Sequence, residues 1–154
     1  MVPCCVIFLL GILPLNDLSV GDSIVRINAR EVNIQPGDAA TIKVPVKVRE
    51  GYHIQAHKVN DEFLVPTTIV IVDAGSLSIV GMKFPPGKKF KLEGSSDFLY
   101  VYDGNFRITI FIKASKNAQK RRFSLRGKLN YQACDVRSCL RPRSLEFVVP
   151  IRIR

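Results

Sequence analysis

The chain has 154 residues, an apolar share of 47% and a formal net charge of +10. This length suits one domain with a buried core, and no repeat, low-complexity tract or linker indicates a second domain. The excess of Lys and Arg is compatible with an anionic partner. Its densest stretch, residues 116–122, lies between two strand patterns and contains no aromatic residue. We interpret this stretch as a solvated hairpin turn and expect no nucleic-acid partner.

The chain begins with a signal-like or anchor-like apolar segment, residues 1–19. Its apolar run, residues 6–13, is too short to span a membrane but has the length of the hydrophobic part of a secretory signal. No Lys or Arg precedes this run, no A-x-A cleavage site follows it, and it is preceded by Cys4 and Cys5. We therefore expect export, with residues 1–19 as a possible membrane tether, and place the folded domain at residues 20–154.

Four segments alternate apolar and polar residues with the period of a half-buried strand. They cover residues 40–49, 106–112, 123–131 and 145–153. Weaker candidates are residues 23–29, 52–57, 67–72, 77–82 and 98–102, with Gly and Pro turn signals between many of the segments. Eight or nine short strands at this spacing, without an amphipathic helix, predict an all-β sandwich.

The first strong strand contains a proline. Val44 and Val46 alternate with Lys43, Pro45 and Lys47, so the strand has one apolar and one polar face. Because proline has no N–H group to donate to a ladder of hydrogen bonds, this strand should lie at a sheet edge or carry a bulge.

Two cysteines stand close together in YQACDVRSCLRP, residues 131–142, which connects the last two strong strands. A reversing loop of this length can bring Cys134 and Cys139 within the Cα separation of about 4.4–6.8 Å that a disulfide needs. As a permanent staple, a bridge over so short a loop contributes only about 2 kcal/mol. Short exposed bridges are also the ones most easily strained and labile. The spacing leaves a permanent staple and an exchanging pair equally open.

Charged residues flank this pair in the sequence. Arg137 and the two following arginines would stabilise a thiolate, whereas Asp135 would oppose it. We count Tyr131, Asp135, Arg137 and Pro142 as residues near the candidate site.

A metal site is the other chemistry to weigh, because His53 and His57 could combine with Cys134 and Cys139 as four ligands. Histidines four apart on one strand lie about 13 Å from each other, too far to share an ion. We expect no metal and interpret His53 as a structural residue. The sequence also has no glycine-rich phosphate loop, no G-x-S-x-G and no H-E-x-x-H, so nucleotide and hydrolase chemistry have no support.

Four stretches together resemble one known family. GYHIQAHKVNDEFLVPTTIVI, KFPPGKKFKL, VYDGNFRITIFI and YQACDVRSCLRP occur in this order. They are similar to the N-terminal domain of the thiol:disulfide interchange protein DsbD, over the chain from about residue 23 to its end. The resemblance implies an immunoglobulin-like β-sandwich in the periplasm or at the extracytoplasmic face of the inner membrane. It also implies exchange of reducing equivalents between a thioredoxin-like donor and oxidised thioredoxin-like acceptor proteins, with no cofactor beyond a cysteine pair.

The resemblance also implies roles for individual residues. Cys134 and Cys139 match the redox pair, with Cys139 bonding the partner and Cys134 resolving the mixed disulfide. A cap loop should fall at residues 91–99 and shield the pair with an aromatic side chain, Phe98 in the first place and Phe90 in the second. The alternative is a non-catalytic binding module in which the two cysteines form a permanent structural disulfide.

Family members continue into a transmembrane domain and a thioredoxin-like domain. We therefore expect this chain to be either part of such a relay or a stand-alone homologue with a separate electron donor.

Overall fold

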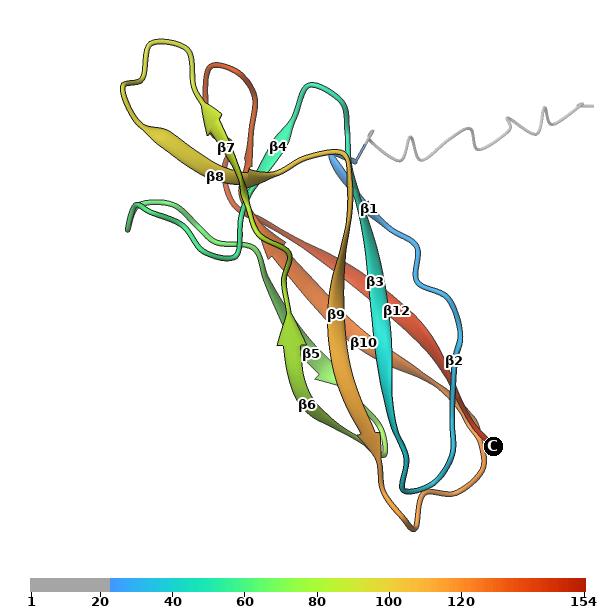
Figure 1. Ribbon diagram of the computed structural model, residues 1–154. Helices are drawn as coiled ribbons and strands as arrows, with labels where there is room; N and C mark the ends of the chain where they lie inside the picture. The colour runs from blue at the N-terminus through green and yellow to red at the C-terminus, as the bar shows by residue number, and fades with distance from the viewer. Residues whose placement is uncertain (1–22) are drawn as a thin grey trace, which may run out of the picture.

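The computed structural model describes residues 23–154, and in this part of the chain all the regular structure is β. The strands form three four-stranded sheets (Figure 1). In chain order they are β1 (Val25–Ile27), β2 (Val32–Ile34), β3 (Ala39–Val48), β4 (His53–Gln55), β5 (Thr68–Asp73), β6 (Leu77–Lys83), β7 (Lys88–Lys91), β8 (Phe98–Tyr102), β9 (Asn105–Ala114), β10 (Arg122–Tyr131), β11 (Ala133–Cys134) and β12 (Arg143–Ile153).

Two of the sheets pack against each other as the sandwich. One has the strand order β1-β3-β9-β6 and the other β2-β12-β10-β5, with all pairs antiparallel except β2 and β12. Every second side chain of β3, β9, β10 and β12 is buried, as the alternating sequence predicts. The inward residues of both sheets form one core, and its fully buried members include Ile42, Ile110, Leu125 and Ile151. This arrangement confirms the predicted immunoglobulin-like β-sandwich.

The third sheet lies at one end of the sandwich, the upper end in Figure 1, and has the order β11-β4-β8-β7. Its strands are short, and β11 has only two residues. The loop that joins β7 to β8 and the loop that follows β11 both extend from this end (Figure 1). The third sheet therefore positions the cysteine loop far from the described C-terminus.

All nine segments that the sequence predicted as strands are strands in the structure. The three additional strands, β2, β7 and β11, are two to four residues long. Such segments are too short to show a period of two, and the sequence of β7, KKFK, has a single apolar residue. They form only because a longer or adjacent strand offers them a partner.

Two predictions were wrong, one about the position of a strand in its sheet and one about a connection between strands. The strand that carries Pro45 is neither an edge strand nor bulged, because β3 lies between β1 and β9 in continuous register. Pro45 is tolerated because the β1 pairing ends at Val46, so its missing N–H falls just past the last pair on that side. Of the predicted hairpin turn at residues 116–122, residues 116–121 are a solvated turn and Arg122 begins β10; the turn connects strands of different sheets and is not a hairpin.

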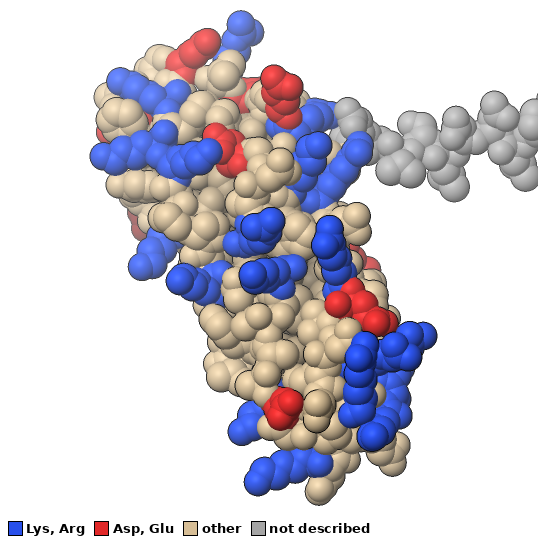
Figure 2. Space-filling model, turned by 45° about the vertical axis from the view of Figure 1, so that its right-hand side comes forward, with Lys and Arg blue, Asp and Glu red and all other residues tan. Residues whose placement is uncertain are grey.

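The positive charge is distributed over the surface. Figure 2 shows Lys and Arg side chains along the whole length of one face, interrupted by few acidic groups. The hollow bounded by β1, β3 and β9 is lined by five of these cations: Arg26, Arg30, Lys43, Lys47 and Arg107. In the described part of the chain there is no helix of the length and hydropathy that a membrane span needs. The signal-like segment lies outside the described residues.

Candidate functional site

The two cysteines are bonded to each other at the end of the β10–β12 hairpin. Cys134 ends β11, and the chain then reverses so that Cys139 stands opposite it as an antiparallel bridge. Their Cα atoms are 3.9 Å apart, and a disulfide joins their sulfurs. The N–H of Leu140 donates to the carbonyl of Ala133 at 2.7 Å and closes the reversal. The prediction that the pair lies close together at one end of the sandwich is confirmed.

Asp135 organises the loop between the two cysteines. Its carboxylate accepts hydrogen bonds from the backbone N–H groups of Arg137 and Ser138, both at 2.7 Å. These two donors hold the pKa of the Asp135 carboxyl below its ordinary value. The N–H of Asp135 also donates to the carbonyl of Ser138 at 2.9 Å. Asp135 therefore fixes the shape of the loop in addition to placing a negative charge near it.

The two cysteines differ in exposure. Cys134 is fully buried, whereas Cys139 is partly exposed. Because β11 pairs with β4, the Cys134 backbone is held in the third sheet, while Cys139 belongs to the loop that leads back to β12. A protein partner that approaches this end of the sandwich meets Cys139 first.

Gln55 of β4 is the polar side chain that contacts the disulfide. Its Nε2 atom lies 3.1 Å from Sγ of Cys134 and 3.7 Å from Sγ of Cys139. The residue is fully buried, and its Oε1 atom has no hydrogen-bond partner among the described residues. Sequence reasoning missed Gln55, because 79 positions separate it from Cys134 and no motif marks it.

His53 lies beside the pair on the neighbouring strand. It stands directly opposite Cys134 in the β4–β11 register. Burial holds the pKa of His53 below its ordinary value, with the charge of Lys88 acting in the same direction and that of Asp103 against it. The Nδ1 atom is buried without a hydrogen-bond partner in the described part of the chain. Burial therefore favours the neutral form of the His53 imidazole.

The histidines that we weighed as metal ligands contact aromatic rings. His53 stacks on Phe90 and His57 stacks on Phe84, each with ring centroids 3.9 Å apart. Nδ1 of His57 also lies 3.0 Å from the carbonyl oxygen of Thr67. Within residues 23–154 no group of three or more His, Cys, Asp or Glu side chains is arranged to hold a metal ion.

The strand register places the two candidate shielding residues on opposite faces of the third sheet. Residues paired across strands point to the same face, and successive residues point to opposite faces. Following the pairs from β11 through β4 and β8 to β7 gives one face that carries Cys134, His53, Gln55, Val101, Leu99 and Phe90. Phe98 lies on the other face, 49% exposed, with the Nζ atoms of Lys89 and Lys91 within 6 Å of its ring.

The predicted cap loop contacts the cysteine loop directly. The N–H of Glu93 donates to the carbonyl of Val136 at 2.9 Å, and the Glu93 carboxylate lies 3.6 Å from the Arg137 guanidinium. Both side chains of this ion pair are largely exposed, so it contributes little by itself. The backbone bond nevertheless places the β7–β8 connection beside the residues between the cysteines, as Figure 1 shows. Shielding of the sulfurs stays a prediction.

The two remaining candidate residues, Tyr131 and Pro142, lie at the two ends of the segment that carries the cysteines. Tyr131 ends β10, is buried in the core below the loop and has a pKa raised by that burial. Pro142 is exposed and precedes β12. Both residues bound the cysteine loop where it joins the sandwich.

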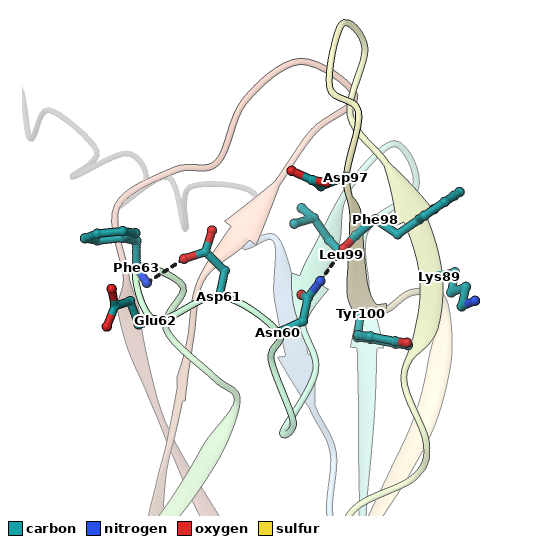
Figure 3. Close-up of a pocket in the computed structure, with 9 residues that line it drawn as sticks. All are labelled: Asn60, Asp61, Glu62, Phe63, Lys89, Asp97, Phe98, Leu99 and Tyr100. Carbon is teal, nitrogen blue, oxygen red and sulfur yellow. Dashed lines mark hydrogen bonds between the residues drawn. The ribbon is translucent and has the colours of Figure 1, made fainter.

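A shallow hollow lies beside the start of β8, lined by Phe98 and by residues 60–63 of the loop after β4 (Figure 3). The amide of Asn60 donates to the carbonyl of Phe98 at 2.6 Å and ties the two segments together. Phe63 is 83% exposed at its rim, and Phe98 and Leu99 point to opposite sides of β8 (Figure 3). The hollow therefore adds exposed aromatic surface near the cap loop.

Comparisons with known proteins bear on the fold and on the family of the chain. None of the curated proteins matches the sequence significantly. The N-terminal periplasmic domain of ScsB from Proteus mirabilis is similar in fold, with a TM-score of 0.54 and 18% identity over 84% of this chain and 45% of that chain. A chain of the Coh-OlpA-Doc918 cohesin–dockerin complex from Clostridium thermocellum matches with a TM-score of 0.45 and 16% identity, over 86% of this chain and 100% of that chain.

This chain thus spans less than half of the ScsB chain that it matches. The sequence also matches a protein family over residues 23–150, which includes all of the third sheet and both cysteines. The description of that family is "Thiol:disulfide interchange protein DsbD, N-terminal". The chain belongs to this family.

Proposed function

We propose that the domain takes reducing equivalents from a thioredoxin-like donor and passes them to oxidised thioredoxin-like proteins outside the cytoplasm, through Cys134 and Cys139. The observation that carries this proposal is the asymmetry of the bonded pair, with Cys134 buried and Cys139 partly exposed at the end of the sandwich. Family membership supports a thioredoxin-like partner and an extracytoplasmic location. Residues 1–19 would tether the domain to the membrane if they are retained.

The covalent steps of the exchange take place on the two cysteines. In the forward direction the Cys139 thiolate attacks one sulfur of the partner's disulfide, and the partner's other sulfur leaves as a thiolate. The Cys134 thiolate then attacks Sγ of Cys139, which forms the intramolecular disulfide and releases the reduced partner. Two electrons pass to the partner, and no cofactor is needed. The donor restores the dithiol by the same steps in reverse.

We assign the shielding role to Phe90 in preference to Phe98. Phe90 lies on the face of the third sheet that carries Cys134, whereas Phe98 lies on the opposite face. The stacking of Phe90 on His53 fixes the ring next to the residue opposite Cys134. Phe98 and Phe63 then belong to an exposed aromatic surface that a partner could contact.

The competing function is a non-catalytic binding module with a permanent disulfide. The reduction potential distinguishes the two, and it is measured by equilibrating the domain with thioredoxin of known potential. An exchanging pair should have a potential near the thioredoxin value of about −270 mV or above, whereas a permanent bridge should lie below about −300 mV. A value in the second range would overturn the proposed function.

A further inference from the structure

We propose that Gln55 is a catalytic residue of this exchange reaction. Its side-chain amide donates a hydrogen bond to the Cys134 sulfur as that sulfur becomes a thiolate, and its carbonyl oxygen accepts from a cysteine thiol once the pair is reduced. The inference rests on the proposed function and adds to it the group that allows a buried sulfur to carry charge.

The need for such a group follows from the burial of Cys134. When a donor thiolate attacks Sγ of Cys139, the disulfide breaks and its electron pair stays with Sγ of Cys134, which leaves as a thiolate. Cys134 is fully buried, so water cannot solvate this charge. A hydrogen-bond donor aimed at the sulfur must take the place of water.

Gln55 is held in the position that this role requires. Its backbone N–H donates to the carbonyl of Gln132 at 2.9 Å, and its carbonyl accepts from the hydroxyl of Thr67. The bond to Gln132 and the pairing of β4 with β11 hold β4 against the strand that carries Cys134, and the bond from Thr67 holds Gln55 from the other side of the chain. The amide nitrogen is then 3.1 Å from that sulfur without any rearrangement. Donors that are already in place when charge develops are the most effective in stabilising it.

The unpartnered oxygen of Gln55 extends this role to the reduced state. Disulfide sulfurs only accept hydrogen bonds, so the amide nitrogen must face them, and Oε1 is left buried without a donor within the described residues. A thiol has an S–H group, which can donate to Oε1 after the amide turns over. The same side chain can therefore bond the disulfide and the thiolate through its amide nitrogen, and the thiol through its oxygen.

Three variants of the full chain test the inference. Gln55→Met keeps the length of the side chain and removes both its donor and its acceptor. Gln55→Glu keeps an acceptor and adds a charge that repels a thiolate. Gln132→Met is the matched control, because Gln132 donates to the carbonyl of Leu140 and accepts from the N–H of Val65, and so supports the same loop without bonding a sulfur. Thermal unfolding of each variant verifies that it is folded.

Two measurements report on the sulfurs themselves. With Cys4 and Cys5 replaced by serine in every variant, thiolate absorbance of the reduced protein against pH gives the ionisation of the pair without any partner. Equilibration with thioredoxin gives its potential. Loss of a hydrogen bond to a charged group should lower the exchange rate of Gln55→Met at neutral pH at least about tenfold. The thiolate titration should move to higher pH, and the potential should fall by about 30 mV for a tenfold change in the equilibrium constant. Gln55→Glu should shift the titration further, and Gln132→Met should leave it unchanged.

An unchanged titration and potential in both Gln55 variants would overturn the inference and leave the proposed function standing. An equal shift in Gln132→Met would also overturn it, because the effect would then come from the loop. If the unaltered protein does not exchange with thioredoxin while the titration still depends on Gln55, the proposed function fails and the contact with the sulfurs is retained.

Discussion

Opening the disulfide should weaken the domain only slightly. The bridge joins residues five positions apart, and for so short a loop chain-entropy reasoning gives about 2 kcal/mol. The main core lies between the two large sheets and is formed by residues such as Ile110 and Leu125, remote in sequence from the cysteine loop. Since small domains are stable by about 5–15 kcal/mol, the reduced form should remain folded.

The expected change is a fall in Tm of about 4–10 °C. In a domain of this size each kcal/mol of lost stability lowers Tm by a few degrees, and the bridge contributes about 2 kcal/mol. Differential scanning calorimetry of the oxidised protein, with and without excess reductant, measures it. The control is the double variant Cys134→Ala, Cys139→Ala, in which reductant can act only on Cys4 and Cys5. It therefore corrects for any effect of reductant on these two residues.

The outcome separates an exchanging pair from a staple. A protein that must cycle between disulfide and dithiol has to keep its partner-binding surface in both states. If reduction unfolded the domain at 37 °C, or lowered Tm by about 20 °C or more, the third sheet would depend on the bridge. The reasoning from loop length and core position would then be refuted, and the permanent disulfide would be the better interpretation.

Three further predictions concern single residues of the site. With Cys134→Ser, an oxidised thioredoxin-like protein should accumulate as a covalent adduct on a non-reducing gel, and Cys139→Ser should trap much less; equal trapping would refute the assigned roles. Phe90→Ala should speed the reaction of the reduced protein with a small disulfide, whereas Phe98→Ala should not; the reverse order would restore Phe98 as the shield. Because the folded pKa of His53 is lowered by burial, stability should fall as the pH drops below about 6.5, where the unfolded chain binds the proton more readily. In urea unfolding between about pH 7 and pH 5, His53→Phe should reduce this loss of stability. If the unfolding free energies of the two proteins depended on pH in the same way, the prediction would be refuted.

Periodicity predicts the sandwich because its strands are long. The strands β3, β9, β10 and β12 are ten or eleven residues long, apolar residues alternate over most of their length, and burial follows this alternation. The third sheet is different, because β7 and β11 are formed by four and two residues whose own sequence has no strand signal. Their conformation is set by β4 and β8, which come from other parts of the chain. Long-range pairing of this kind cannot be inferred from local pattern.

The candidate site divides in the same way. Cys134 and Cys139 are recognisable because they are close in sequence and lie between two strong strands. The contact of Gln55 with both sulfurs depends on the pairing of β4 with β11, and the choice between Phe90 and Phe98 depends on the register of β7 with β8. A shift of one residue in that register would exchange the faces of the two phenylalanines. The resemblance predicted the position of the cap loop, but only the register of β7 with β8 distinguishes Phe90 from Phe98.

The polar atoms that the fold leaves unpaired point to the same place. In residues 23–154 three buried side-chain atoms have no hydrogen-bond partner, and two of them, Nδ1 of His53 and Oε1 of Gln55, lie on the face of the third sheet that carries Cys134. An unpaired buried polar atom costs about 1–3 kcal/mol, so two on one face destabilise the oxidised state shown here. A sequence selected only for a stable sandwich would place apolar side chains at both positions. Their presence beside a sulfur that must alternate between acceptor and donor is the pattern that a working redox site predicts.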